Sequence, residues 1–276
     1  MIETQTTKGT QETTDMAQKT TQQTLSPQIK SAVIDLLYRL ADDNLALGHR
    51  NSEWTGLAPI LEADIAFSSM AQDKMGHALT FYKLLESLGE PAPDAQAFLR
   101  LADAFHCCSL VCLERGDWAL SIVRHFFFDE AMAVRCQALM TGRYAPLAEV
   151  AAKLRGELKY HVMHGRLNVT KLGRGTEESH ARMQTAVDRL FPHALGMFEP
   201  TEADQTIADA EIQPREADLC KAWRDRVEPI LHEAGLSVPA QAQPVYGGRA
   251  GKHPATFARL LEDMQEVYRL DPAAKW

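Results

Sequence analysis

The sequence predicts an all-α protein in which long amphipathic helices form a bundle. From Ile29 onward, apolar residues recur at three- and four-residue steps, which is the spacing of one helical face. No segment shows a sustained alternation of apolar and polar residues, so the sequence predicts no strand. Prolines and glycines stand at the ends of the periodic segments, where they begin or stop a helix.

Residues 1–27 are predicted to be a disordered polar tail, and residues 28–276 a single helical domain. Between Met1 and Ser26 the chain holds nine threonines and five glutamines but no apolar face. Such a segment buries too little apolar surface to offset the entropy lost on ordering. Over the whole chain 45% of the residues are hydrophobic, which is enough for a sizeable core.

The first two predicted helices form one hairpin. The first starts at Ser26 and Pro27, an N-cap residue followed by a first-turn proline. The second opens at Pro59 and ends at Leu88–Gly89, a stop signal that two prolines reinforce. Glu53–Trp54 lies between the two helices, and we interpret it as the anchor of their connection.

The next two predicted helices form a second hairpin. The third helix follows Gly116–Asp117 and is stopped by Gly142. The fourth runs from about Pro146 to Leu172, where Gly173 and Gly175 stop it. Three further helices are predicted at Glu177–Met197, from near Pro214 to near Gly235, and at Phe257–Tyr268.

The composition argues against several classes of protein. A net charge of −8 provides no basic footprint for nucleic acid or an anionic membrane, so neither is expected as a partner. No run of about 18 apolar residues could span a membrane. No apolar stretch near the N-terminus marks a secretory signal, so we expect a cytoplasmic protein. Without a CxxC pair, five cysteines are interpreted as buried small hydrophobic residues: Cys107, Cys108, Cys112, Cys136 and Cys220.

Some polar residues follow the ligand pattern of a di-iron helical bundle. In such bundles two helices each supply one carboxylate, and two others each supply an inward-facing Glu-x-x-His pair. On the first predicted helix, Asp43 is in register with the apolar face. Thirty-one residues later comes Lys74-Met-Gly-His77. His77 therefore stands where a ligand histidine belongs, but Lys74 replaces its glutamate.

The second half of the pattern is incomplete in the same way. Asp129 on the third predicted helix offers the other lone carboxylate, and 29 residues later comes Leu158-Lys-Tyr-His161. His161 is in place, whereas Leu158 replaces the second glutamate. A protonated lysine and a leucine cannot ligate iron, so the sequence predicts a vestigial site without bound metal. From the residues alone, Glu157 could instead complete a non-standard half-site with Asp129 and His161.

Lys74 suggests how such a vestigial site could stay folded. Two carboxylates close together in an apolar bundle repel each other and resist ionisation. We hypothesise that the Lys74 ammonium takes the place of the metal and neutralises Asp43 and Asp129. As separate residues, the two aspartates would be ordinary hydrogen-bonded core residues and Lys74 a surface lysine.

A glycine-rich basic stretch near the C-terminus has two interpretations. Tyr246–Arg249 and the following Gly251–His253 could bind a phosphate through backbone N–H groups. The stretch lacks the strand-to-helix context of a phosphate-binding loop. We therefore favour an ordered surface turn.

Several segments resemble the C subunits of phenylacetic acid degradation, a ferritin-like family. The resemblance extends over nearly everything after the polar tail. It is carried by Leu40–Trp54, Leu61–Ala66, Asp73–His77, Phe127–Asp129, Gly247–Arg249, Met264–Gln265 and Lys275–Trp276.

The resemblance implies a ferritin-like bundle with a four-helix core and additional C-terminal helices. It implies a structural subunit, without catalytic residues or cofactors of its own, that pairs with a homologous A subunit. The A subunit holds the di-iron centre and epoxidises the aromatic ring of phenylacetyl-CoA with O₂. A small B subunit bridges the assembly, and a flavin and iron–sulfur reductase supplies electrons from NADPH.

Two other functions stay open from the residues. One is a catalytic oxygenase with an unorthodox metal site, which iron content and turnover by the chain alone would reveal. The other is a stand-alone helical binding protein, which would not co-purify with an A-type subunit. The unorthodox site would use Asp43, His77, Asp129, Glu157 and His161.

Overall fold

The computed structural model describes residues 25–274, which form ten α-helices, three short 3-10 helices and no strand. The all-α, ferritin-like prediction is confirmed. All but the last three residues of the predicted polar tail lie outside the described part. None of the helices formed by residues 25–274 combines the length and the apolar character that a membrane crossing requires.

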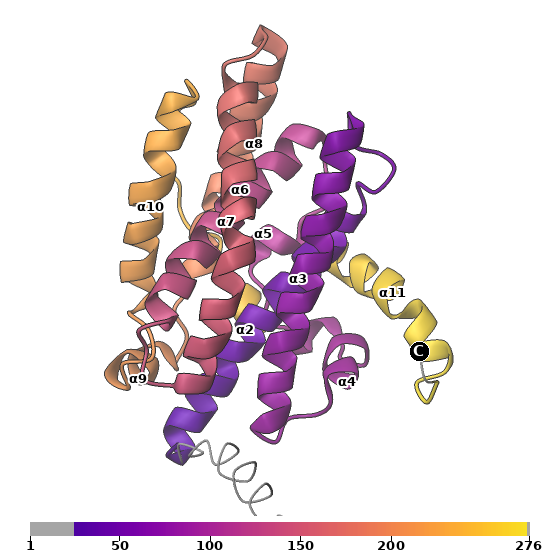
Figure 1. Cartoon of the computed structure of the whole chain (residues 1–276), viewed down its shortest axis with the longest axis vertical. Coiled ribbons are helices and arrows are strands. Elements are labelled where there is room, and N and C mark those ends of the chain that lie inside the picture. Colours follow the sequence, from indigo (N-terminus) through magenta and orange to yellow (C-terminus); the bar gives the residue numbers. More distant parts are fainter. Residues whose placement is uncertain (1–24, 275–276) are drawn as a thin grey trace, which may run out of the picture.

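Two antiparallel hairpins make the core of the bundle (Figure 1). The first pairs α2 (Pro27–Ser52) with α3 (Leu61–Ser87), and the second pairs α6 (Trp118–Leu139) with α7 (Ala145–Gly173). These are the two most extensive helix contacts in the described chain, and α3 also lies against α7. Both predicted hairpins are therefore confirmed, and Lys74, Asp129 and His161 of the di-iron pattern meet between them.

The ends of the long helices follow local chemistry. The Ser26 hydroxyl accepts a hydrogen bond from the Ile29 N–H at 3.3 Å, and the Asp117 carboxylate accepts one from the Leu120 N–H at 2.9 Å. Gly89, just after α3, has a φ of 96°, a conformation that glycine adopts without a steric penalty. The prediction for α3 differs slightly, since the helix begins at Leu61 rather than at Pro59.

Three α-helices were absent from the prediction. They are α4 (Pro93–Phe98), α5 (Ser109–Cys112) and α9 (Asp204–Asp209), each six residues long or shorter. Helices of one or two turns are too short to show a periodic apolar face, so the pattern carries no signal for them.

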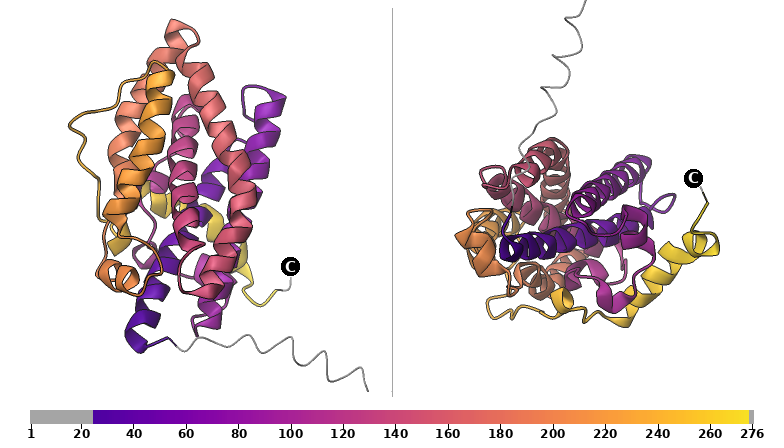
Figure 2. Two further views of the ribbon diagram at one scale, coloured as in Figure 1. Left: turned by 60° about the vertical axis from the view of Figure 1, so that its left-hand side comes forward. Right: turned by 90° about the horizontal axis from the view of Figure 1, so that it is seen from below.

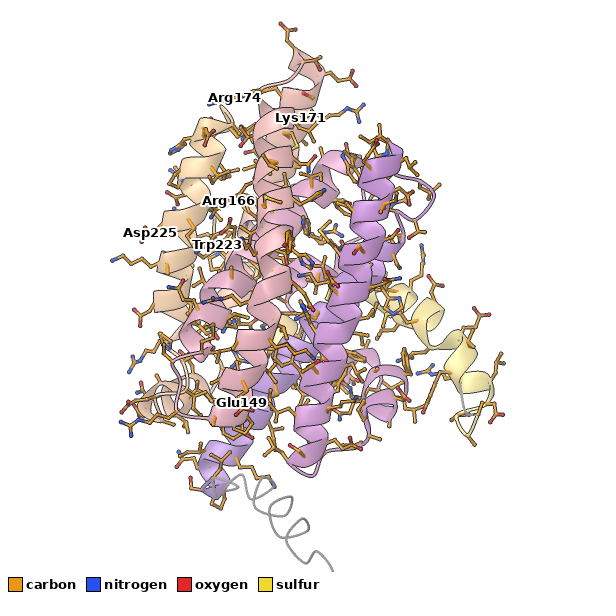
Figure 3. The ribbon with its side chains drawn as sticks, viewed as in Figure 1. Glu149, Arg166, Lys171, Arg174, Trp223 and Asp225 are labelled. Atoms are coloured by element: carbon orange, nitrogen blue, oxygen red, sulfur yellow. The ribbon has the colours of Figure 1, made fainter. Side chains whose placement is uncertain are left out.

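Further helices cover the outside of the core. α8 (Glu177–Leu195) and α10 (Glu216–Glu233) pack against α6 on one side of the bundle. Trp223 lies on the bundle side of α10 and donates from Nε1 to the Phe127 carbonyl at 3.0 Å, while Asp225 is exposed on the outer side (Figure 3). The last helix, α11 (Ala255–Leu270), extends away from the bundle beside α4 (Figure 2).

Candidate functional site

A buried group of charged and titratable side chains lies at the middle of the bundle, and we call it the Asp129 centre: Lys74, His125, Asp129 and His161. Lys74 from α3 forms an ion pair with Asp129 from α6, and both side chains are fully buried. Within α6, His125 Nδ1 lies 2.6 Å from the second Asp129 oxygen. His161 Nδ1, from α7, lies 3.6 Å from the Asp129 oxygen that pairs with Lys74.

Local packing brings the Lys74 ammonium to this carboxylate. A side chain at Gly48 on α2 would meet the Lys74 Cβ at 3.2 Å, so the glycine lets α3 approach α2 closely at this level. The ammonium also lies 4.8 Å from the centroid of the Phe128 ring, a favourable cation–π distance. Lys74 therefore enters the apolar interior with two compensating contacts.

The lysine has a direct effect on the protonation of Asp129. Burial by itself would raise the pKa of this carboxyl, because a charge is poorly solvated inside the bundle. The positive charge of Lys74 and the contact with His125 act in the opposite direction and hold its pKa well below the usual range. Asp129 is therefore an ionised carboxylate whose counter-charge is an ammonium.

Two hydrogen bonds on the solvent side of the Asp129 centre join α3 to α7. His161 Nε2 lies 2.9 Å from an Asp73 oxygen, and His77 Nε2 lies 2.7 Å from a Glu157 oxygen. The rings of His77 and His161 are stacked with centroids 6.2 Å apart. A groove of about 390 Å³ runs between the two helices above them. Its lining includes Asp73, Glu157, Tyr160, His161 and His164.

Asp43 does not join this group, which corrects the hypothesis that Lys74 neutralises both aspartates. Its carboxylate accepts hydrogen bonds from the Cys108 N–H at 2.7 Å and from Arg249 Nη1 at 2.9 Å. Asp43 thus faces the segment that leads into α5 rather than α3. Lys74 pairs with Asp129, and Arg249 supplies the separate cation for Asp43.

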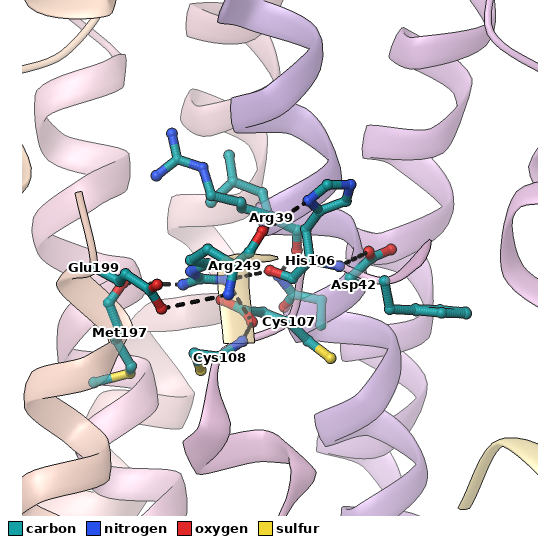
Figure 4. A network of polar contacts seen from close by, with 12 residues as sticks. Arg39, Asp42, His106, Cys107, Cys108, Met197, Glu199 and Arg249 are labelled. Atoms are coloured by element: carbon teal, nitrogen blue, oxygen red, sulfur yellow. Dashed lines mark hydrogen bonds and ion pairs between the residues drawn. The ribbon is translucent and has the colours of Figure 1, made fainter. Parts of the chain in front are cut away.

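The stretch around Arg249 forms an ordered turn, as predicted, but the Arg249 side chain is not at the surface. Arg249 is only 6% exposed and donates to the carbonyls of His106 and Met197 as well as to Asp43 (Figure 4). Gly247, with a φ of 113°, turns the chain inward, and its N–H donates to the Glu199 carboxylate at 2.9 Å. The Arg249 side chain is therefore engaged inside the protein rather than free to bind a phosphate, whereas Lys252 is exposed.

The anchor predicted between the first two helices is confirmed. Trp54 is buried and donates from Nε1 to the Ser121 hydroxyl at 2.8 Å. Glu53 forms an ion pair with Arg50 at 2.6 Å. The Trp54 hydrogen bond ties the α2–α3 connection to the start of α6.

The sequence pattern did not predict His125, a member of the Asp129 centre, or Asp73, the partner of His161, although both stand close in sequence to a predicted residue. His125 precedes Asp129 by four residues, a spacing that places both on one face of α6. Asp73 is adjacent to Lys74 and serves as the partner of His161. The di-iron pattern contains neither position, so a comparison with the pattern alone overlooks them.

The donor set of this centre does not fit two irons. Leu158 is buried without offering any ligand atom, and the Lys74 ammonium lies against the Asp129 carboxylate. Asp43 is bound to Arg249, while Glu157 contacts His77 rather than Asp129. The half-site of Asp129, Glu157 and His161 is consequently not assembled, because Glu157 lies on the solvent side with a side chain that is 46% exposed.

The histidines of the site make stability sensitive to acid. Burial, together with the charge of Lys74, lowers the pKa of His77 to about 3, and burial lowers that of His164 to about 4. An unfolded histidine titrates near pH 6.5, so as the pH falls below about 6.5 the unfolded state takes up protons first. The free energy of unfolding is therefore expected to decrease from about pH 6.5 towards pH 4.

His77→Gln tests whether His77 contributes to the loss of stability in acid, because glutamine keeps an amide donor for Glu157 but does not titrate. Urea unfolding at several pH values is expected to show a shallower loss of stability for this variant than for the wild type. His232→Gln, at an exposed position on α10, is the matched control and should keep the wild-type slope. Parallel curves for His77→Gln and the wild type would contradict the assignment.

Comparison with known proteins identifies the family to which this helical chain belongs. The family described as phenylacetic acid catabolic protein matches residues 8–276. The chain is 33% identical to the C subunit of 1,2-phenylacetyl-CoA epoxidase from Escherichia coli over 239 residues, covering 86% of this chain and 96% of the relative. It is 25% identical to the A subunit of that epoxidase over 192 residues, covering 67% and 62% respectively. The chain therefore belongs to the phenylacetic acid catabolic protein family.

Proposed function

We propose that this chain is the structural, non-catalytic C-type subunit of a phenylacetyl-CoA epoxidase complex. The similarity to the epoxidase's C subunit over almost the full length of that relative supports membership of such a complex. The additional similarity to its A subunit supports an assembly of two related bundles, one of which is this chain. The reacting CoA ester, the di-iron centre and the O₂ chemistry would then belong to an A-type partner.

The observation that carries this proposal is the ion pair between Lys74 and Asp129, which stand at two ligand positions of the di-iron pattern. An ammonium satisfies the buried carboxylate electrostatically but provides no site for O₂ or substrate. His161 from α7 and Lys74 from α3 both contact this α6 carboxylate, which links three helices, and His125 contacts it from within α6. In this proposal the centre of the bundle has kept its structural role and lost the redox metal.

The face formed by α3 and α7 is the proposed contact with the A-type subunit. Its exposed apolar side chains flank the groove above the Asp129 centre, on two helices that lie side by side at the front of Figure 1. We define the α3–α7 face by Leu61, Ile65, Tyr160, Met163 and Leu167, each between 51% and 72% exposed. Gathered apolar residues of this kind mark protein interfaces.

A related bundle is the partner that this face fits best. Two long helices offer an elongated apolar surface, which another pair of long helices can cover over the area of an obligate interface, about 2,000 Å² or more. A B-type component and an electron-supplying reductase complete the proposed complex. They need no site in the Asp129 centre.

Co-expression with the A-type subunit of the same source, followed by anaerobic Fe(II) loading and desalting, tests the proposal. The chain alone is expected to retain almost no iron and to turn over no phenylacetyl-CoA. The pair should co-purify and carry about two irons, the content of one di-iron bundle. Supplying the reductase and the B-type component should then restore turnover.

Surface variants test the proposed face in the same experiment. Ile65→Glu combined with Leu167→Glu is expected to abolish co-purification while leaving the helical circular dichroism of the chain unchanged. Leu270→Glu on α11, where the side chain is 82% exposed, is the matched control and should leave the pair intact. Loss of the pair with Leu270→Glu alone would contradict the proposed face and place the partner at α11.

Two results would overturn the function itself. Close to two irons on the isolated chain, with turnover, would establish the oxygenase alternative and make Asp43, His77, Asp129, Glu157 and His161 the residues to mutate. Failure of the wild-type chain to bind the A-type subunit during any stage of purification would instead favour a stand-alone binding protein.

A further inference from the structure

A second group of potential ligands lies around α5, on elements that the Asp129 centre does not use. The sulfurs of Cys107 and Cys112 are 3.2 Å apart, and His253 Nδ1 lies 3.6 Å from Cys112 Sγ and 4.0 Å from Cys107 Sγ. Within residues 25–274, no other three histidine, cysteine or acidic side chains bring their ligand atoms within 4.8 Å of one another.

The histidine is already oriented as a ligand. Its Nε2 lies 3.0 Å from the Phe105 carbonyl, which can only accept a hydrogen bond, so Nε2 must carry the proton. Nδ1 therefore keeps its lone pair and faces both sulfurs. This is the arrangement that metal-binding histidines show, with the other ring nitrogen donating to a carbonyl. The ring packs on Phe257 with centroids 4.6 Å apart, which fixes its plane.

We propose that Cys107, Cys112 and His253 form a zinc site. Zinc binds thiolate sulfur at about 2.3 Å and imidazole nitrogen at about 2.0–2.1 Å in tetrahedral geometry, which separates two sulfurs by about 3.8 Å and sulfur from nitrogen by about 3.6 Å. The observed sulfur–nitrogen distances of 3.6 and 4.0 Å are close to this value. The sulfurs need to separate by only about half an ångström.

The charge balance favours a divalent cation. On binding, each thiol loses its proton to solvent, and two thiolates with one neutral imidazole and Zn²⁺ give a complex without net charge. A neutral complex suits this place, since both cysteines are fully buried. A monovalent cation such as Cu⁺ would leave one uncompensated negative charge in the interior. The three side chains supply three of the four zinc ligands, and in this proposal a water molecule is the fourth.

Such a metal would join two parts of the chain that are far apart in sequence. Cys107 precedes α5 and Cys112 is its last residue, whereas His253 follows the turn that carries Arg249. Zinc would hold this C-terminal segment against α5 and keep Arg249 beside Asp43. The site is thus structural and independent of the proposed epoxidase role. Its ligands also differ from Cys108 and Cys136, which fit the sequence interpretation as buried small residues.

Cobalt substitution of the reduced full-length chain under anaerobic conditions tests the site. One equivalent of Co²⁺ is expected to produce near-ultraviolet thiolate charge-transfer bands and visible bands of tetrahedral cobalt, and one equivalent of Zn²⁺ should remove both. X-ray absorption of the zinc-loaded wild type should give two sulfur neighbours and at least one nitrogen neighbour. This readout needs no variant and stands even if the variants fold poorly.

Variants identify the ligands. Cys112→Ser and His253→Gln are expected to weaken Co²⁺ binding by at least about tenfold. Cys108→Ser changes a buried neighbour outside the trio and should bind as the wild type does. Unchanged binding by Cys112→Ser, or spectra without thiolate bands, would overturn the proposal as adventitious binding only. Failure of the reduced chain to bind metal, with a Cys107–Cys112 disulfide as purified, would overturn it in favour of a redox pair.

Discussion

Lys74→Met is expected to lower the free energy of unfolding by about 3–5 kcal/mol, the cost of removing one partner from a buried ion pair. Methionine fills a similar volume, so the loss reports the stranded Asp129 carboxylate rather than a cavity. Urea unfolding at pH 7 measures it. Lys159→Met, at an exposed position on α7, is the matched control and should change stability by less than about 0.5 kcal/mol.

A second substitution separates charge from packing. Lys74→Met combined with Asp129→Leu removes both charges and is expected to recover most of the loss, because apolar replacements of a buried pair are often neutral or stabilising. The folded pKa of Asp129 is depressed, so its stabilising contribution is present above the unfolded value near 3.9 and is lost as the pH falls. Without Lys74, burial raises the pKa of Asp129, so the deficit of Lys74→Met should begin to shrink above about pH 4 as the pH falls and continue to shrink below it. A deficit below about 1 kcal/mol at pH 7 would rule out the role of Lys74 as a substitute for the metal charge.

Arg249→Met is expected to cost a similar amount, about 3–5 kcal/mol, because it strands the Asp43 carboxylate. It also leaves the carbonyls of His106 and Met197 without their donor. Chemical denaturation monitored by Trp fluorescence and by circular dichroism measures the loss. Arg259→Met on α11, where the side chain is exposed, should have little effect.

The variant Arg249→Lys separates the loss of the positive charge from the loss of the hydrogen-bond donors. Arg249→Lys keeps the positive charge but cannot reproduce the fork of donors that reaches Asp43 and two carbonyls. Its stability is expected to fall between the wild type and Arg249→Met. Equal stability of Arg249→Met and Arg259→Met would show that Asp43 finds another partner.

The long helices could be predicted because each spans several turns, so its apolar stripe repeats often enough to be recognised. The same geometry explains which parts of the site were predictable. Lys74 and His77 share a face of α3 because they are three residues apart, and His125 and Asp129 share a face of α6. Which residues share a face of one helix can thus be predicted from their spacing in the sequence.

Contacts between segments that are far apart in the sequence cannot be predicted in this way. Charge arguments correctly required a cation for the buried aspartates, but they could not say that two different cations serve them. Asp43 and Arg249 are 206 residues apart, and no local pattern connects them. Cys107 and His253 are likewise separated by 146 residues, so the cysteines could be interpreted only as core residues.

The pairing of Asp43 with Arg249 has a consequence for the order in which the protein is made. Asp129 and Lys74 both emerge from the ribosome long before synthesis ends, so the centre of the bundle can neutralise its charge during translation. Asp43 lies on the first core helix, yet its cation, Arg249, follows 206 residues later, after all four core helices. A nascent bundle that already contains every core helix still carries one uncompensated interior carboxylate. The segment that carries Arg249 supplies the missing cation, so a chain that stops before Arg249 leaves Asp43 on α2 without its ion-pair partner.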